Sequence, residues 1–101
     1  MDIEYIKDLV RQGRFSVSEH AALRKLQRGI FDDEIVSTIL EGRTIQEYPN
    51  AIPYPRAVFR SYRAAASPIE VVCDIDEEYE KVIIVTVEKA RSRRGRGRER
   101  R

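Results

Sequence analysis

The only histidine in the chain, His20, is followed by arginines at positions 24 and 28. Steps of four residues along an α-helix drift by about 40°, so His20, Arg24 and Arg28 share one strip about 80° wide and roughly 12 Å long. We call these three residues the basic strip. An imidazole can move protons near neutral pH, and a guanidinium pairs bidentately with phosphate oxygens. The residue types and their spacing therefore favour a site for a phosphodiester.

Such a site could cleave RNA without a metal ion. When the 2′-hydroxyl of the substrate attacks its own phosphate, the protein must supply a base, an acid and positive charge near the phosphorane. His20 could act as the base or the acid, with Arg24 and Arg28 as an electrostatic clamp. Because the chain has one histidine, the second proton transfer would fall to a tyrosine, a carboxylate, an arginine or water.

The same spacing also occurs on solvated helix faces. Glu19 and Asp32 could pair with the arginines there, for about 0–1 kcal/mol per exposed pair. In that interpretation His20 caps or packs near the start of its helix. In either case we expect the opposite side of the helix to face the core; it carries Ala22, Leu23 and Leu26.

Helical spacing of apolar residues predicts helices in the first half of the chain. The first covers residues 2–12. Ser16 or Ser18 can cap the second, which runs to Arg28 and ends at a left-handed Gly29. These boundaries place the basic strip on the second helix.

A third helix is predicted to begin at a cap on Asp32 or Asp33 and to end at Gly42. Stretches rich in β-branched and aromatic residues then predict four strands, at residues 43–48, 57–63, 69–75 and 81–88. Residues 82–87 are apolar at almost every position, which is typical of a central strand covered on both sides. The order predicts an α+β fold, with N-terminal helices packed on one face of a four-stranded, mainly antiparallel sheet.

The charge of the chain is divided between a body and a tail. Residues 91–101 hold seven arginines and one glutamate, so the other ninety residues carry a net charge of −4 within the total of +2. We expect one globular domain over residues 1–90 and, because the tail lacks apolar residues, a disordered tail at 91–101. A mildly acidic body can bind nucleic acid only through local clusters of basic residues.

Composition also excludes several classes of site. One cysteine, Cys73, allows no internal disulfide, and we interpret it as a buried apolar residue. Asp74 lies on a predicted strand, and the acidic residues at 76–80 lie in a turn without a glycine-bearing loop of the calcium-binding type. We interpret this segment as a solvated turn and expect no metal and no cofactor. No apolar stretch is long enough to cross a membrane and the first residues do not resemble a signal peptide, which favours a cytoplasmic protein.

Further basic and aromatic residues could contact nucleic acid. Arginines and a tyrosine alternate along one predicted strand, where they could grip phosphates and stack on bases, or simply pack against neighbouring strands. The tail arginines could bind RNA through counterion release. These candidates are Arg56, Arg60, Tyr62, Arg91, Arg93 and Arg94.

One run of residues resembles the signature of a family of uncharacterised bacterial domains. It is His20-Ala21-x-x-Arg24-x-x-x-Arg28-Gly29-Ile30, and the likeness continues through Tyr48-Pro49 to a closing strand with Ile84-Val85-Thr86. It spans about residues 14–90. The resemblance marks Thr86, which could orient a phosphate or the His20 ring, or could serve only as a good strand residue.

The order of helices and strands is also similar to that of RelE-like and BrnT-like toxin ribonucleases. This resemblance implies RNA as a ligand and a small antitoxin-like protein as a partner. We therefore expect an RNA-binding domain that could act as a metal-independent endoribonuclease, with His20, Arg24, Arg28 and Thr86 at its site. The alternative is a non-catalytic protein-interaction module that uses the basic strip or a sheet edge.

Overall fold

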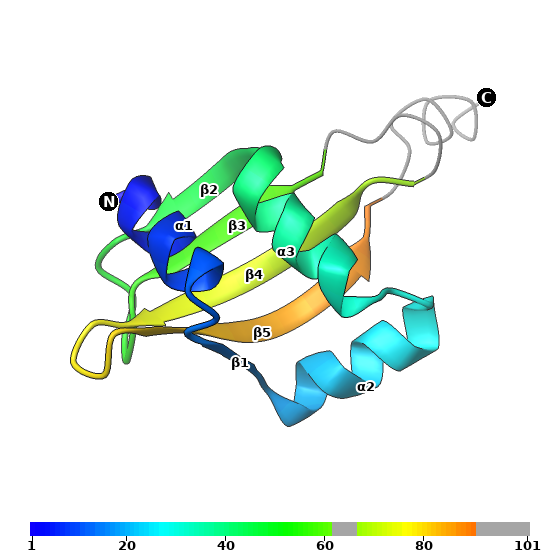
Figure 1. The fold of residues 1–101 in the computed structure, drawn as a ribbon, viewed down its shortest axis with the longest axis horizontal. Helices are drawn as coiled ribbons and strands as arrows, with labels where there is room; N and C mark the ends of the chain where they lie inside the picture. Colours follow the sequence, from blue (N-terminus) through cyan, green and yellow to red (C-terminus); the bar gives the residue numbers. More distant parts are fainter. Residues whose placement is uncertain (62–66, 91–101) are drawn as a thin grey trace.

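The computed structural model describes residues 1–61 and 67–90. Within these residues, helices and strands alternate at first, and a run of strands follows (Figure 1). The elements are α1 (Ile3–Arg11), β1 (Phe15–Val17), α2 (Glu19–Arg28), α3 (Asp32–Glu41), β2 (Arg43–Tyr48), β3 (Arg56–Arg60), β4 (Ile69–Asp76) and β5 (Lys81–Lys89). No helix in these ranges is long and apolar enough to cross a membrane.

The strands form one mixed sheet in the order β1-β5-β4-β3-β2. β1 runs parallel to β5, and the other neighbours are antiparallel. The α+β class is confirmed. The predicted count of four strands is wrong because it lacks β1, whose parallel pairing makes the sheet mixed, while the other three pairings are antiparallel. β1 has three residues, Phe-Ser-Val, which is too short for an alternating pattern to be recognised.

The helices occupy two different places on the sheet. α1 and α3 cross one face, where α3 contacts β2, β3 and β4, and α1 contacts β5 (Figure 1). α2 lies beyond β1, along β5, at the edge of the sheet. The expectation that the N-terminal helices share one face therefore holds for α1 and α3 and fails for α2.

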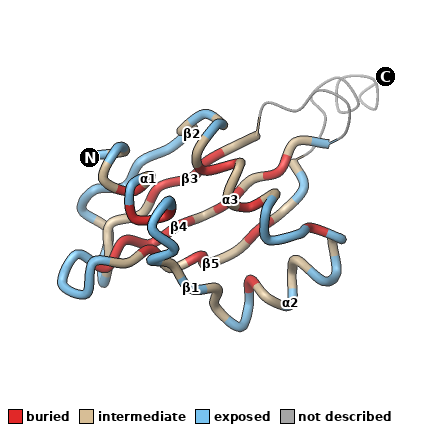
Figure 2. The backbone as a smooth tube through the Cα atoms, in the orientation of Figure 1, coloured by how far each residue is buried: buried red, intermediate tan, exposed pale blue. Residues whose placement is uncertain are grey.

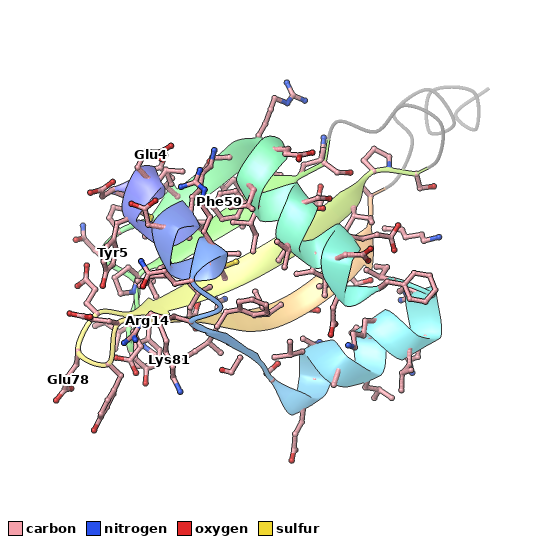
Figure 3. The ribbon with its side chains drawn as sticks, viewed as in Figure 1. Glu4, Tyr5, Arg14, Phe59, Glu78 and Lys81 are labelled. Carbon is pink, nitrogen blue, oxygen red and sulfur yellow. The ribbon has the colours of Figure 1, made fainter. Side chains whose placement is uncertain are left out.

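The core lies between the sheet and the pair α1 and α3 (Figure 2). Phe59 of β3 is fully buried there, beneath the two helices (Figure 3). Ile6, Ile35 and Ile39 reach it from the helices and are at most 1 % exposed. This layer provides a rigid support for β5, the strand that carries α2.

α2 presents the opposite side to the one that its sequence predicts. Leu23 and Leu26 are 55 % and 78 % exposed, whereas Ala21 is fully buried. The prediction that Ala22, Leu23 and Leu26 face the core is therefore wrong for the two leucines, whereas Ala22 is half-buried. α2 packs against the edge of a strand, where a small side chain at Ala21 lets the helix approach β5 closely. The leucines consequently remain on the solvent side.

The predicted caps of α2 are confirmed, and those of α3 need correction. Gly29 ends α2 in the left-handed region, with φ 66°. α3 begins after Phe31, whose N–H donates to Glu34 Oε1 at 2.9 Å. Asp32 and Asp33 do not cap this helix; they lie in its first turn, where the helix dipole favours negative charge.

The predicted strand at 57–63 begins one residue earlier and ends at Arg60. Gly42, at the end of α3, has an extended backbone. The close approach of β3 requires a glycine at this position, because a Cβ would lie 2.3 Å from the carbonyl oxygen of Arg60. Tyr62 and the tail at residues 91–101 lie outside the described residues.

The orientation of α2 can be tested by truncating one leucine. We expect Leu26→Ala to change the free energy of unfolding by less than about 0.5 kcal/mol, because an exposed side chain buries little apolar area. The control Ile39→Ala should lower it by about 2–5 kcal/mol through cavity formation. Urea denaturation measures both. A loss at position 26 as large as that at position 39 would contradict the observed orientation.

Candidate functional site

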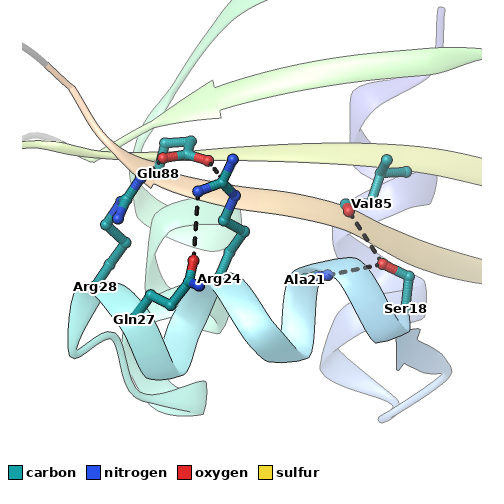
Figure 4. A network of polar contacts seen from close by, with 7 residues as sticks. All are labelled: Ser18, Ala21, Arg24, Gln27, Arg28, Val85 and Glu88. Atoms are coloured by element: carbon teal, nitrogen blue, oxygen red, sulfur yellow. Dashed lines mark hydrogen bonds and ion pairs between the residues drawn. The ribbon is translucent and has the colours of Figure 1, made fainter.

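β1 and the residue after it hold the start of α2 against β5. The Ser18 N–H donates to the carbonyl of Ile84 at 3.0 Å, extending the parallel pairing of β1 by one residue. Ser18 Oγ donates to the carbonyl of Val85 at 3.0 Å and accepts from the N–H of Ala21 at 3.0 Å (Figure 4). One serine thus caps α2 and fastens it to β5, and this position directs the following turns along the strand.

The two arginines of the basic strip converge on a single carboxylate. Arg24 Nε lies 3.1 Å from Glu88 Oε2, and Arg28 Nε lies 3.2 Å from Glu88 Oε1 (Figure 4). Arg24 Nη1 also donates to Gln27 Oε1 at 3.4 Å. The three ion-pairing side chains are 33–38 % exposed, so water and solutes can reach them. The group carries a net charge of +1.

Glu88 is the residue that sequence reasoning missed. It comes from β5, sixty positions after Arg28, and the helix pattern gave no reason to pair the two. The predicted partners do not bind the strip: Asp32 pairs with Lys25 instead, and no ion pair joins Glu19 to either arginine among the described residues. The one signal in the sequence was a carboxylate near the end of a strand that is otherwise mostly apolar.

The third member of the strip, His20, lies exposed in the first turn of α2. Its imidazole makes no hydrogen bond or ion pair with residues 1–61 or 67–90. The capping role that the alternative interpretation gave it belongs to Ser18. His20 is therefore on the solvent side of the helix, one turn before Arg24, with its ring nitrogens available to a ligand.

A bulge in β5 decides which way the end of this strand faces. The register with β4 shifts at Val85, which has no partner there. Beyond the bulge, Val87 is buried in the core. Because side chains alternate along a strand, Thr86 and Glu88 point to the opposite face of the sheet. We call this the outer face.

Thr86 lies on the outer face opposite Val72 of β4. The residue as a whole is half-buried, but its hydroxyl oxygen is itself buried and has no hydrogen-bond partner among the described residues. The predicted contact between Thr86 and the His20 ring does not occur as a hydrogen bond. Thr86 thus holds an unused hydrogen-bonding group two residues before Glu88.

The predicted sheet arginines also lie on the outer face, in cross-strand ion pairs. Arg56 donates to Asp74 bidentately, at 2.7 Å from Nε and 3.2 Å from Nη2, and this hydrogen bonding raises the pKa of the Arg56 guanidinium. Arg60 Nε donates to Glu70 Oε2 at 2.9 Å. Both pairs follow the register of β3 and β4. In the structure, Arg56 and Arg60 thus pair with residues of the neighbouring strand, which is one of the two roles expected from the sequence. Both guanidiniums stay partly exposed.

Other reactive groups do not contribute a second site. Cys73 is fully buried, and burial raises the pKa of its thiol, so the nucleophilic thiolate is disfavoured. Within the described ranges, no group of three or more His, Cys, Asp or Glu residues could hold a metal ion. The basic strip with Glu88 remains the strongest candidate.

A protein-family model matches residues 17–89, from the end of β1 to the end of β5. Its description is "Domain of unknown function (DUF4258)". The chain belongs to this family. The DUF4258 match covers the basic strip, Thr86 and Glu88, and it confirms that the chain is a domain of unknown function. No curated protein and no solved structure matches the chain.

The role of Ser18 in placing α2 gives a direct test. We expect Ser18→Ala to lower the free energy of unfolding by about 1–2 kcal/mol, because it removes a helix cap and a bond to β5. Ser16→Ala, at an exposed position of β1, is the matched control and should cost less than about 0.5 kcal/mol. Thermal and urea unfolding measure both variants. Equal stabilities for the two would show that Ser18 does not fasten the helix.

Proposed function

We propose that this DUF4258 domain binds RNA at the basic strip and cleaves it without a metal ion. One observation carries the proposal: Arg24 and Arg28 already hold the two oxygens of a single carboxylate, Glu88. This arrangement is that of an oxyanion between two guanidiniums, the geometry that phosphate recognition uses. The exposed imidazole of His20 on the same helix adds a group that can move protons.

The cluster retains capacity for a second anion. A guanidinium has five N–H donors, and the contacts described above use Nε of each arginine and one Nη1 of Arg24. Two guanidiniums against one carboxylate also leave a net charge of +1. A phosphodiester carries one negative charge, so its binding would neutralise the group. The remaining donors and the remaining charge therefore both suit a phosphodiester.

The proposed reaction is transfer within the substrate. His20 accepts the proton of the 2′-hydroxyl as its oxygen bonds to phosphorus. Arg24 and Arg28 stabilise the additional negative charge of the phosphorane. The bond from phosphorus to the 5′-oxygen then breaks, and that oxygen takes a proton from the imidazolium or from water. The products are a 2′,3′-cyclic phosphate and a 5′-hydroxyl, with no oxidant or co-reactant required.

The outer face and the tail would extend the binding surface in this proposal. Arg56 and Arg60 would attract the flanking backbone, and Thr86 would reach a phosphate oxygen only after a local rearrangement that exposes its buried hydroxyl. Tyr62 and the tail arginines would add contacts without sequence preference. The resemblance to RelE-like and BrnT-like ribonucleases was drawn from helices followed by four strands, an order that β1 changes, and a fold does not by itself specify an activity; the proposal therefore depends on the site.

Replacement of the histidine separates chemistry from binding. We expect wild type to cleave an RNA oligonucleotide in the presence of EDTA, and His20→Ala to lower the rate at least about 100-fold, because a general acid or base typically contributes that much. The affinity for an uncleavable 2′-O-methyl RNA should stay within about twofold. Gel analysis of end-labelled RNA measures the rate, and fluorescence anisotropy measures the affinity.

A 2′-deoxy substitution at one linkage is the chemical control, and cleavage should stop at that linkage alone. Leu23→Ala, an exposed change on the same helix, is the protein control and should cleave at the rate of wild type. Wild-type cleavage by His20→Ala would end the catalytic proposal. If neither wild type nor any variant binds RNA, the whole proposal fails.

A second candidate function is a non-catalytic module that binds a small antitoxin-like protein. It is favoured by large apolar side chains exposed beside the strip, Leu23, Leu26 and Phe31. Leu26 and Phe31 also line an open concavity of about 410 Å³ between α2 and α3. Exposed apolar surface of this kind is typical of protein interfaces. Such a module would cleave no RNA. Leu26→Asp would abolish its binding to the small antitoxin-like protein.

A further inference from the structure

Glu88 occupies the position that the proposed function gives to a phosphate, yet it has the same sign of charge as a phosphate. It is held by Arg24 and Arg28 at 3.1 and 3.2 Å. A glutamine at this place could accept hydrogen bonds from the same arginines without lowering the charge of the site. The physical consequence of a glutamate is therefore electrostatic: it reduces the charge of the arginine pair from +2 to +1.

The neighbours of Glu88 across the sheet do not change this charge balance. Glu70 of β4 stands opposite Glu88 in the register, and two like charges placed directly opposite destabilise a sheet. Glu70 is already paired with Arg60. Among residues 1–61 and 67–90, the positive groups bound to Glu88 are the two strip arginines, and any anion that joins them must share them with its carboxylate.

The electrostatic repulsion by the Glu88 carboxylate differs between two kinds of phosphate. An internal RNA linkage is a monoanion, and its binding makes the cluster neutral. A terminal phosphate monoester carries nearly two negative charges above its second pKa of about 6. Its binding leaves an excess negative charge beside the Glu88 carboxylate. The repulsion from Glu88 is twice as large for the dianion as for the monoanion.

We propose that Glu88 is a specificity-determining residue that reduces the preference of Arg24 and Arg28 for terminal phosphates over internal RNA linkages. This inference rests on the proposed function, since it concerns the same site. Relative to an arginine pair without Glu88, the domain would bind internal linkages better in comparison with RNA ends. In the cleavage reaction, this change in preference suits an endonuclease.

The experiment compares two probes that differ in charge at one phosphate. They are uridine 3′-monophosphate and its methyl ester, both with a 2′-O-methyl group that prevents cleavage. Their dissociation constants are measured at pH 8 by NMR titration of ¹⁵N-labelled protein. At a separation of about 6 Å in water, we expect Glu88→Gln to tighten binding of the ester about threefold and of the monophosphate about tenfold. The preference for the monophosphate should thus rise about threefold over wild type.

Glu78→Gln is the matched control, because it removes the same charge from an exposed turn. Glu78 lies in the turn that joins β4 to the start of β5 (Figure 3). Glu88 lies near the other end of β5. This separation exceeds the screening length of about 8 Å at physiological salt. The control should leave both dissociation constants nearly unchanged. An equal effect of Glu78→Gln and Glu88→Gln would overturn the inference.

A second measurement changes the charge of the monophosphate probe by lowering the pH. At pH 5.5 the monophosphate is mostly a monoanion, since its second pKa is about 6. The threefold difference in preference between wild type and Glu88→Gln should then become smaller, because only about a quarter of the monophosphate is still a dianion. An undiminished threefold difference at pH 5.5 would contradict the charge argument. If the wild type binds RNA but Glu88→Gln tightens both probes equally at pH 8, this inference fails and the proposed function stands; if the wild type binds neither probe nor RNA, the proposed function itself fails.

Discussion

The hydrogen bonds that fasten β1 and Ser18 to β5 decide where the basic strip lies. β1 pairs with β5 only as far as Ile84, and Ser18 then bonds to the next part of the same strand. α2 consequently continues beside β5 where another strand would otherwise pair. This placement turns the buried side of the helix toward the strand edge and brings Arg24 and Arg28 to Glu88. A helix on the face of the sheet, like α3, would have directed the same side chains elsewhere.

Local features of the fold could be predicted from the sequence because they depend on neighbouring residues. The Ser18 cap and the left-handed Gly29 are examples, since each is decided within one turn of the helix. The orientation of α2 could not be predicted in the same way. Amphipathic reasoning assumes that a helix buries its most apolar side, but a strand edge offers backbone groups and a carboxylate, so Ala21 is buried while Leu26 is exposed.

The candidate site was also only partly predictable from the sequence. The spacing of His20, Arg24 and Arg28 was sufficient to predict that they share one side of a helix. Their partner Glu88 was not predictable, because it lies sixty positions further along the chain and faces α2 only after the bulge at Val85. Glu88 changes the interpretation of the strip. Two free arginines would form a strongly cationic patch, whereas the observed cluster is a pair of guanidiniums already bound to one oxyanion, with one positive charge left.

The central claim is that an RNA phosphate joins Arg24, Arg28 and Glu88 at α2. It is tested most directly by NMR titration of the ¹⁵N-labelled, full-length protein with uncleavable 2′-O-methyl RNA, following the arginine Nε–H resonances. The account predicts the largest shifts at Nε of Arg24 and Arg28, with saturation at one affinity and smaller shifts at Arg56 and Arg60. Saturable shifts confined to the tail arginines, with those of α2 unmoved, would contradict it.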